Sequence, residues 1–523
     1  MRGEDFFYID QKVAETLFRE SLETRSVYRV FNLYGPLGSG KTTFLEHIQE
    51  HYLQKNRNYA YVKIDFANRL MHNPKYAIMH LAKELEERYD YDFISLWKAY
   101  AILWQKRYDN SLLMYANDLP YIHEIKKLLN IDKKGRSFIK IIKGLFKDNI
   151  YKALEALKEL DSTEIEKRLL FFFAEDFKNM LKNKNLKDSI VLIDNHNLLD
   201  EKSYDSPCKK DAWVRELVSY LGKNTLFVIA SKEPILWHKC NVALKSNLKE
   251  YTFKPFSVRD TKRYLKHFNI IDENLQEALI TLSKKEPFLL YIAKEGYKNA
   301  SKETIPVVKE ELYKSFFANF SQDELQLLEL LSFVRTIDKD FLVFAVKQYN
   351  LSLSAKDIDK FLSKEFFKAI NHKLYYLDTL LVAKLNSQVE EAKKKEYLSF
   401  IFSYYENILH SLDKELIKNT PELIDEIIEE AWYYLRLING DVNKHLEWLN
   451  YYVARFFMYA AWEAFIERYL QILPRVQKHA PKESLVLLYN NLAGLYESIG
   501  EAKLAKKYYE KVVQLNRPQK LSA

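Results

Sequence analysis

A glycine-rich segment near the N-terminus constrains the fold of this chain more than any other feature. Residues 35–42 read GPLGSGKT and fill every fixed position of the G-x-x-x-x-G-K-[ST] phosphate loop. Residues 27–34, just before it, are rich in β-branched and aromatic side chains and predict a strand. Residues 43–48, just after it, begin an amphipathic helix pattern. Strand, glycine loop and helix form the context that this motif requires.

The residue types of the loop indicate phosphate and magnesium binding. Glycines let the backbone turn its N–H groups towards a phosphate, and the following helix adds the positive end of its dipole. We expect Lys41 to reach the β- and γ-phosphates of a nucleotide. Thr42 is expected to hold Mg²⁺ through its hydroxyl, because magnesium shares an octahedral oxygen shell among water, phosphate and few side chains.

Composition predicts a reduced, cytoplasmic, multidomain protein. A length of 523 residues corresponds to roughly three or four domains at ~150 residues each. The chain has two cysteines, Cys208 and Cys240, without metal-ligand spacing, and no apolar run long enough to span a membrane. The net charge of +8 is mild, and the most basic stretch, 133–147, has acidic residues on both sides. We therefore interpret that stretch as a solvated helical face, and nucleic acid is not the favoured partner.

The remaining strands predict a parallel sheet with helices on both faces. Apolar stretches at 59–66, 189–194, 225–231 and 251–253 read as buried strands. We assign residues 1–256 to a P-loop α/β nucleotide-binding domain. About 120 residues separate the second and third strands, far more than one crossover helix needs, and their pattern is helical. They predict a helical insertion at about 70–187, whose role is either packing or a lid or partner surface.

Three further domains are predicted to follow. Residues 257–314 have helical patterns and predict a helical bundle. Residues 315–390 predict a winged helix, because Ser321 and Glu324 form a capping box and 366–377 resemble a hairpin. Residues 391–523 predict α-helical tetratricopeptide-like repeats that bind a protein or peptide. The clearest repeat carries small and large residues at Leu492, Gly494, Tyr496, Gly500, Ala505, Tyr509 and Pro518, in which the aromatics are expected to fill the groove between helices.

Polar residues at two strand ends are candidates for chemistry. Asp194 is expected to complete the magnesium site beside Thr42, although a strand-end aspartate can also act as a helix cap. Asn195 follows where many related ATPases carry glutamate, and an amide cannot take a proton from water, which predicts slow hydrolysis. His196 is a candidate to replace that glutamate, or simply a solvated or hydrogen-bonded loop residue. Ser231 is placed to sense a γ-phosphate, or to cap its strand.

Together these residues resemble the STAND class of signalling ATPases, which includes the NACHT and NB-ARC groups. The phosphate loop, the strand ending at Asp194 and the strand end at Ser231 and Lys232 carry the resemblance. The turn at 254–256 and the segment 286–290 extend it over about residues 10–385. In that class a nucleotide domain is followed by a helical bundle, a winged helix and a repeat array used as sensor.

The resemblance implies ATP or ADP and Mg²⁺ as ligands, with Pro287 closing over the base. It implies a closed ADP form that opens on exchange for ATP and then forms homo-oligomers. The catalytic residues would be Lys41, Asp194, Asn195 and Ser231, and the metal ligands Thr42 and Asp194. The nucleotide-binding residues would be Gly35, Pro36, Leu37, Gly38, Ser39, Gly40, Lys41, Thr42, Thr43 and Pro287.

Two departures and two alternatives accompany this reading. Residues 8–11 replace the usual Gly-Arg-Glu segment of the class, and Asn195 replaces its second acidic residue. Few residues precede the first strand, so we expect the output to come from a partner rather than from an N-terminal effector domain.

One alternative is a DNA-associated AAA+-like loader, against which the balanced charge of 355–361 argues. The other is a protein-binding scaffold in which nucleotide is only structural.

Overall fold

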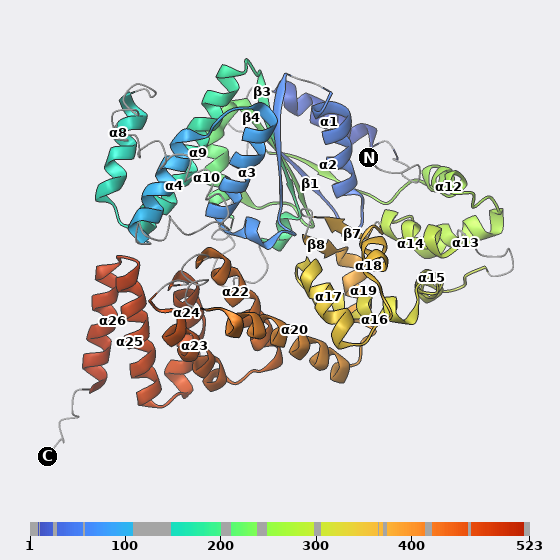
Figure 1. Cartoon of the computed structure of the whole chain (residues 1–523). Helices are drawn as coiled ribbons and strands as arrows, with labels where there is room; N and C mark the ends of the chain where they lie inside the picture. The colour runs from blue at the N-terminus through green and yellow to red at the C-terminus, as the bar shows by residue number, and fades with distance from the viewer. Residues whose placement is uncertain are drawn as a thin grey trace. The chain divides into compact units, whose positions relative to one another are not determined.

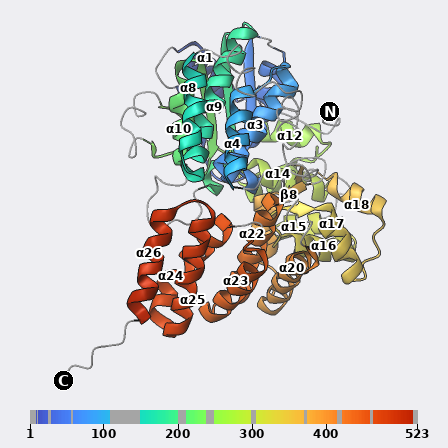
Figure 2. The ribbon, with the colours of Figure 1, turned by 60° about the vertical axis from the view of Figure 1, so that its left-hand side comes forward.

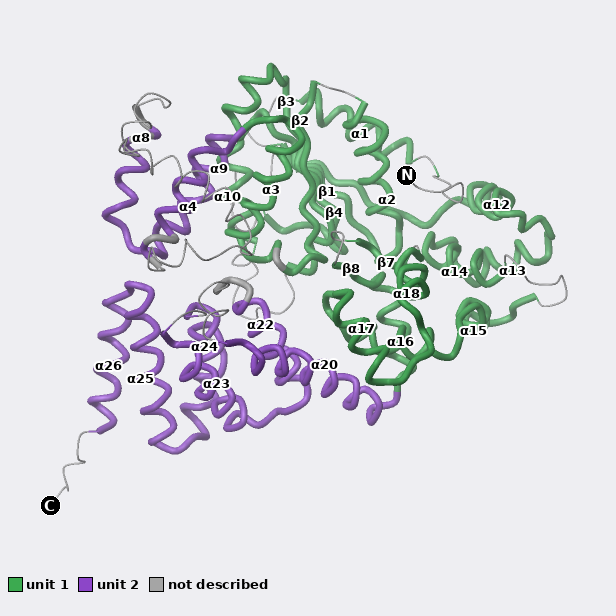
Figure 3. Tube along the Cα trace, in the orientation of Figure 1, with its two compact units in different colours: residues 1–91, 177–389 green, residues 92–176, 390–523 purple. Residues whose placement is uncertain are grey.

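The computed structural model divides the chain into two compact units (Figure 3). The first comprises residues 1–91 and 177–389, and the second comprises residues 92–176 and 390–523. The described residues are 9, 11–24, 29–55, 58–107, 148–199, 211–237, 248–297, 305–364, 366–369, 374–413, 421–458 and 462–516. The predictions made for Cys208, Cys240, Pro518 and the basic stretch 133–147 therefore lie outside the described residues, as do Tyr8 and Asp10.

A five-stranded parallel sheet forms the centre of the first unit (Figure 1). Its order is β2-β3-β4-β1-β5, and every neighbouring pair runs parallel. The strands are β1 (Arg29–Tyr34), β2 (Tyr59–Asp65), β3 (Asp188–Asp194), β4 (Thr225–Ser231) and β5 (Leu248–Thr252). The predicted parallel sheet is confirmed, and β5 begins three residues earlier than the predicted strand at 251–253.

Strands β3 and β4 are buried along their whole length because helices cover both faces of the sheet. Every residue of β3 and of β4 is buried, as expected from their continuous apolar runs. Helices α1 (Lys12–Glu23) and α2 (Lys41–Ile48) pack Phe18, Phe44 and other apolar side chains against one face. Helices α3 (Pro74–Tyr89) and α10 (Ala212–Leu221) lie on the other face (Figure 1). Short helical turns are η1 (Gln49–Leu53), η2 (Arg69–His72), η5 (His196–Leu198) and η6 (Gly222–Asn224).

Two smaller modules complete the first unit. Helices α12 (Val258–His267), α13 (Glu273–Ser283), α14 (Pro287–Tyr297) and α15 (Lys309–Phe317) follow the sheet. The described residues of the range 321–387 then form what we call the hairpin module. It contains α16 (Gln322–Leu331), β6 (Ile337–Asp338), α17 (Lys339–Gln348), α18 (Ala355–Leu362), β7 (Phe367–Ala369), β8 (Leu374–Leu377) and α19 (Thr379–Asn386). The predicted capping box is confirmed, because Ser321 Oγ accepts from the Glu324 N–H and Glu324 accepts from the Ser321 N–H. The predicted hairpin is also confirmed, since β7 and β8 pair antiparallel.

The second unit is helical throughout its described residues (Figure 2). Its first segment contains α4 (Ile94–Arg107), α8 (Asp148–Ala156), η4 (Leu157–Glu159) and the start of α9 (Ser162–Asn183). Its second segment contains α20 (Glu391–Ser411), α22 (Pro421–Ile438), α23 (Val442–Phe456), α24 (Trp462–His479), α25 (Lys482–Ser498) and α26 (Ala502–Asn516). Within the unit, the Ser162 hydroxyl donates to the Ile499 carbonyl at 2.8 Å and joins the two segments. None of the described helices combines the length and apolar character needed to cross a bilayer.

The last two helices pack as a tetratricopeptide-like pair, with one difference from the prediction. Tyr496 on α25 stacks on Tyr508 of α26, with ring centroids 5.6 Å apart. The exposed fraction of Tyr508 is 7%, whereas that of Tyr509 is 41%. The groove is therefore filled by Tyr508, and the expectation for Tyr509 is wrong. Adjacent residues point to different sides of a helix, and packing against α25 decides which side of α26 is buried.

A buried ion pair connects α1 to the sheet. Arg29 Nη1 lies 3.3 Å from Asp188 Oδ1, and both side chains are sealed from solvent. The same guanidinium donates to the carbonyls of Ser21, Leu22 and Lys223. Because a guanidinium carries five donors, one side chain can join α1, β3 and the turn before β4.

Replacing this arginine should destabilise the first unit strongly. Arg29→Met leaves the Asp188 carboxylate in the interior without the Arg29 cation, and we expect a loss of about 3–5 kcal/mol in the free energy of unfolding. Adding Asp188→Leu should recover much of that loss, because an apolar pair replaces the ion pair. Equilibrium urea unfolding of the native chain, the single variant and the double variant measures both values. A double variant less stable than Arg29→Met would contradict this account.

Candidate phosphate-binding site

The phosphate loop connects the carboxyl end of β1 to the first residue of α2. Gly38 has φ +74° and Gly40 has φ +93°, backbone conformations that side chains with a Cβ rarely adopt. Gly40 is the residue before α2, so the unpaired N–H groups of the first helical turn face the loop. The local sequence thus produces the concave, donor-lined turn that the motif predicted.

Lys41 is folded back over the loop. Its Nζ donates to the carbonyls of Gly35 and Pro36, at 2.8 Å each, and to Ser39 Oγ at 3.2 Å. Burial lowers the pKa of Lys41 to about 8, and the attraction of Asp194 opposes that shift. An ammonium group held only by neutral oxygens in a poorly solvated site favours a phosphate as an additional partner.

A cavity of about 250 Å³ opens above the loop. Three groups of elements from the first unit form its walls: the loop with the ends of the sheet, the helices after the sheet, and the hairpin module. The predicted residues among its lining are Leu37, Gly38, Ser39, Gly40, Lys41, Thr42, Thr43, Asp194, Asn195 and Pro287. Gly35 and Pro36 are outside the lining and hold Lys41 through their carbonyls. Ile9 and Gln11, from the segment that departs from the STAND pattern, also line the cavity.

The hairpin module contacts the loop directly. It contributes Phe366, Lys368, Tyr376, Asp378 and Thr379 to the lining of the cavity. A Cβ built on Gly38 would overlap Leu380 of α19 and would lie 2.7 Å from the Cβ of Phe288. The N–H of Phe288, at the start of α14, also donates to the Gly38 carbonyl at 3.3 Å. Gly38 is therefore a glycine both for its positive φ and because two other modules approach its backbone.

Thr42 and Asp194 meet as the motif predicted. The Thr42 hydroxyl donates to Asp194 Oδ1 at 3.2 Å. Among the described residues, no group of three or more His, Cys, Asp or Glu side chains could hold a metal ion by itself. A hydroxyl beside a carboxylate nevertheless fits Mg²⁺ where phosphate and water supply the other oxygens. The metal roles of Thr42 and Asp194 stay predictions with this geometry in their support.

Two charged residues that the motif did not indicate lie beside Asp194. Asp65 ends β2 and is paired in register with Asp194 at the end of β3. Lys63 Nζ lies 3.3 Å from Asp194 Oδ2 and 3.9 Å from Asp65 Oδ2. Burial alone would lower the pKa of Lys63, but the attraction of Asp194 and then of Asp65 raises it above its ordinary value. The sequence carried one signal, since β2 and β3 both end in Ile-Asp.

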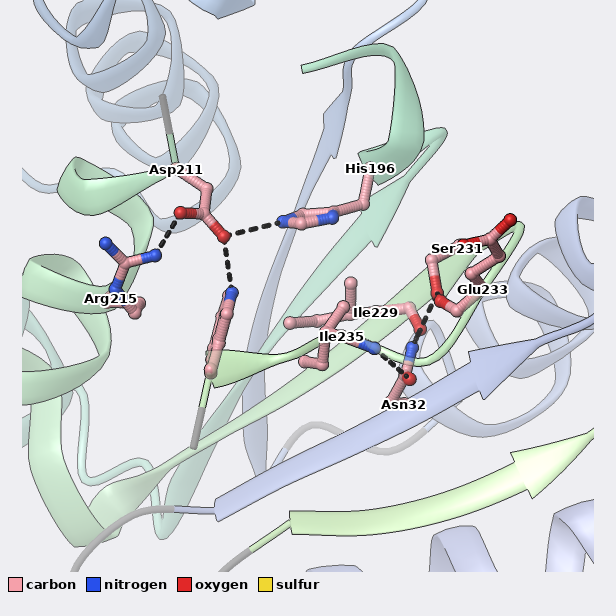
Figure 4. Close-up of polar contacts among 9 residues, drawn as sticks. Asn32, His196, Asp211, Arg215, Ile229, Ser231, Glu233 and Ile235 are labelled. Carbon is pink, nitrogen blue, oxygen red and sulfur yellow. Dashed lines mark hydrogen bonds and ion pairs between the residues drawn. The ribbon is translucent and has the colours of Figure 1, made fainter. Parts of the chain in front are cut away.

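Ser231 is hydrogen bonded inside its own strand-end turn (Figure 4). Its hydroxyl donates to the Glu233 carbonyl at 2.6 Å and accepts from Asn32 Nδ2 at 2.9 Å. Asn32 Oδ1 accepts from the Ile235 N–H, so Asn32 on β1 holds the whole turn after β4. Ser231 does not line the cavity. Its predicted sensor role stays a prediction, and these contacts agree with the strand-capping alternative.

His196 does not line the cavity, and its ring is directed towards Asp211 (Figure 4). Its Nε2 lies 3.6 Å from Asp211 Oδ2, which also accepts from Trp237 Nε1 at 2.5 Å and whose other oxygen pairs with Arg215. Burial lowers the pKa of His196 to about 4, and Asp211 only partly opposes that effect. The imidazole is therefore neutral at physiological pH, and its contacts are those of a core residue.

Comparisons with known proteins complete the description of the site. No family model matches the chain. The uncharacterized ATP-binding protein MJ1659 of Methanocaldococcus jannaschii is 23% identical over 320 residues, which cover 57% of this chain and 75% of that protein. Among solved structures, the STAND protein with a tetratricopeptide repeat sensor PH0952 from Pyrococcus horikoshii aligns with 98% of this chain at 14% identity, with a TM-score of 0.44.

This chain covers 65% of the Pyrococcus horikoshii protein. The Walker-type ATPase PABY2304 of Pyrococcus abyssi aligns with 74% of this chain and 97% of its own length, at 15% identity and a TM-score of 0.32.

Substituting two loop glycines separately should distinguish backbone strain from module packing. Gly38→Ala and Gly40→Ala both place a Cβ at positive φ, at a cost of about 1–2 kcal/mol each. Only the Gly38 variant also collides with Phe288 and Leu380, because the nearest atom to a Cβ at Gly40 is Pro287 Cγ at 3.9 Å. We expect urea unfolding to show an additional loss of about 1–3 kcal/mol for Gly38→Ala. Equal losses would mean that the hairpin module does not pack on the loop in solution.

The buried histidine should make stability depend on pH. The unfolded chain binds a proton at His196 near 6.5, whereas the folded chain does so only near 4, so the free energy of unfolding falls as the pH is lowered between these values. His196→Gln should remove about 2 kcal/mol of the fall between pH 7 and pH 5. Urea unfolding of both proteins at the two pH values measures this difference. An equal fall in both would contradict the neutral, buried imidazole.

Proposed function

We propose that this chain is an ATP- and Mg²⁺-dependent signalling switch of the STAND type. In this proposal the phosphate loop binds ATP or ADP, hydrolysis is slow, and nucleotide exchange controls opening and homo-oligomerisation. The hairpin module acts as the predicted winged helix, and the C-terminal helices act as repeats that sense a protein or other ligand. The domain boundaries are those predicted from the sequence.

One observation carries this proposal: the walls of the cavity come from three modules that meet at the loop. A ligand in that cavity touches the loop, the start of α14 at Pro287, and the hairpin module at Lys368 and Tyr376. A ligand can shift an equilibrium between arrangements only through different contacts in each. Contacts to three modules at once supply that difference, which a nucleotide bound by the loop alone would lack.

The chemistry of the site supports a nucleotide with slow turnover. A lysine over a glycine loop and a hydroxyl beside a carboxylate match a nucleoside triphosphate with magnesium. The Methanocaldococcus jannaschii relative is described as ATP-binding, which agrees with this ligand. Asn195 Nδ2 donates to Asp65 Oδ1 at 2.9 Å. Because an amide is not a base, the residue after Asp194 cannot accept a proton from water.

The final helix pair supports the sensing part of the proposal. Leu487 on α25 and Tyr509 and Val513 on α26 are exposed apolar or aromatic side chains. Such residues supply contact area at low cost when a protein or peptide covers them.

Mass in solution with each nucleotide tests the switch. We expect the native chain to assemble with ATP or a non-hydrolysable analogue and to remain smaller with ADP. Lys41→Ala should abolish both nucleotide binding and assembly, because it removes the ammonium over the loop. Multi-angle light scattering gives the mass, and a fluorescent nucleotide titration gives the affinity.

Lys184→Ala is the matched control, since Lys184 is exposed and does not line the cavity. It should behave as the native chain. An unchanging monomer with turnover stimulated by DNA would favour the loader alternative. Tightly bound, unexchanged nucleotide with neither assembly nor turnover would favour the scaffold.

A further inference from the structure

Asp65 carries a carboxylate, which can accept a proton from water, whereas the amide of Asn195 cannot. It ends β2 directly beside Asp194 at the end of β3, so both carboxylates lie at the strand edge that carries the loop. The exposed fraction of the Asp65 side chain is 22%, whereas that of Asp194 is 2%. Water can therefore reach Asp65, whereas Asp194 is buried and contacts Lys63 and Thr42.

The two oxygens of Asp65 have different environments. Oδ1 accepts from Asn195 Nδ2 and from the Ala67 N–H, at 2.9 Å each, and these two donors fix the orientation of the carboxylate. Oδ2 accepts from the Tyr376 hydroxyl at 3.1 Å and lies 3.9 Å from Lys63 Nζ. Oδ1 is bonded by residues that follow β2 and β3, whereas Oδ2 is bonded by Tyr376 of the hairpin module.

Tyr376 contacts both this carboxylate and the cavity. Tyr376 and Asn195 line the cavity, whereas Asp65 does not. A movement of β8 that breaks the hydrogen bond from the Tyr376 hydroxyl would free Asp65 Oδ2 to accept from a water molecule. Lys63 would keep the two neighbouring carboxylates of Asp65 and Asp194 together, since its ammonium lies close to both.

We propose that Asp65 is the carboxylate that activates the attacking water, and that the Tyr376 hydroxyl withholds it in the arrangement seen here. This inference rests on the proposed function. The water oxygen forms a bond to the γ-phosphorus, and its proton passes to Asp65 Oδ2. The bond from the γ-phosphorus to the β–γ bridging oxygen breaks, and its electron pair stays with the departing ADP. The proton then leaves Asp65 for the released phosphate or solvent.

Among the carboxylates that line the cavity, Glu46 provides an internal comparison. Glu46 lies on α2, four residues and about one turn beyond Thr42, whereas Asp65 lies at the strand edge beside Asp194. Tyr375 provides a second comparison, because it neighbours Tyr376 on β8 and its side chain points to the opposite face of the strand. Glu46→Gln therefore tests a competing carboxylate beside Asp65→Asn, and Tyr375→Phe is the matched control for Tyr376→Phe.

Three measurements on the full chain test the inference. They are the affinity for a fluorescent ATP analogue, the rate of phosphate release, and the ratio of ATP to ADP retained on the protein after incubation with ATP. Asp65→Asn should lower phosphate release about 100-fold or more and retain ATP, with affinity within about threefold of the native value. Tyr376→Phe should raise phosphate release about tenfold, because it removes one hydrogen bond to the carboxylate. That gain should vanish in the double variant, Tyr375→Phe should behave as the native chain, and Glu46→Gln should lower phosphate release far less than Asp65→Asn does.

The outcomes separate this inference from the proposed function. Native chain that fails to bind ATP overturns the proposed function itself. Binding with unchanged phosphate release in Asp65→Asn, or a large loss in Glu46→Gln instead, overturns the role of Asp65 alone. Bound ATP that neither the native chain nor Tyr376→Phe hydrolyses also overturns it. If Asp65→Asn does not fold, equal rates for Tyr376→Phe and Tyr375→Phe give the same negative answer.

Discussion

The parallel, in-register pairing of the strands is the constraint on which the rest of the structure depends. Because all five strands run in one direction, their carboxyl ends meet at one edge of the sheet. The phosphate loop leaves β1 there, and Asp65 and Asp194 end the paired strands β2 and β3 at the same level. A slip of one residue between β2 and β3 would turn one of the two carboxylates to the opposite face and away from the loop.

The backbone of Gly38 is the second point on which the first unit depends. It combines a left-handed φ with close contacts to Phe288 and Leu380, which belong to different modules. The absence of a side chain thus serves both the phosphate cradle and the packing of later modules against it. This double use places a short loop in contact with Leu380, more than 300 positions further along the chain.

Polar residues at the strand ends divide between internal bonding and the cavity. The Ser231 hydroxyl is hydrogen bonded to Asn32 and Glu233, and the His196 ring lies beside Asp211. These contacts stabilise the turns beside the site. Asp194 and Asn195 border the cavity instead. These four residues follow similar apolar strands in the sequence, so residue type and position alone did not separate the two groups. Their hydrogen-bond partners come from other strands and turns, and only the fold brings those together.

The sequence alone determined the phosphate loop, the parallel sheet and the capped helices, because each depends on local spacing, turn chemistry or a continuous apolar run. It did not determine that Tyr508 rather than Tyr509 fills the repeat groove, since the phase of a helix is set by its neighbour. Nor did it indicate the contact between Tyr376 and Asp65, whose positions differ by 311 residues. Such contacts depend on how separate modules pack, and short sequence patterns carry no information about packing between distant segments.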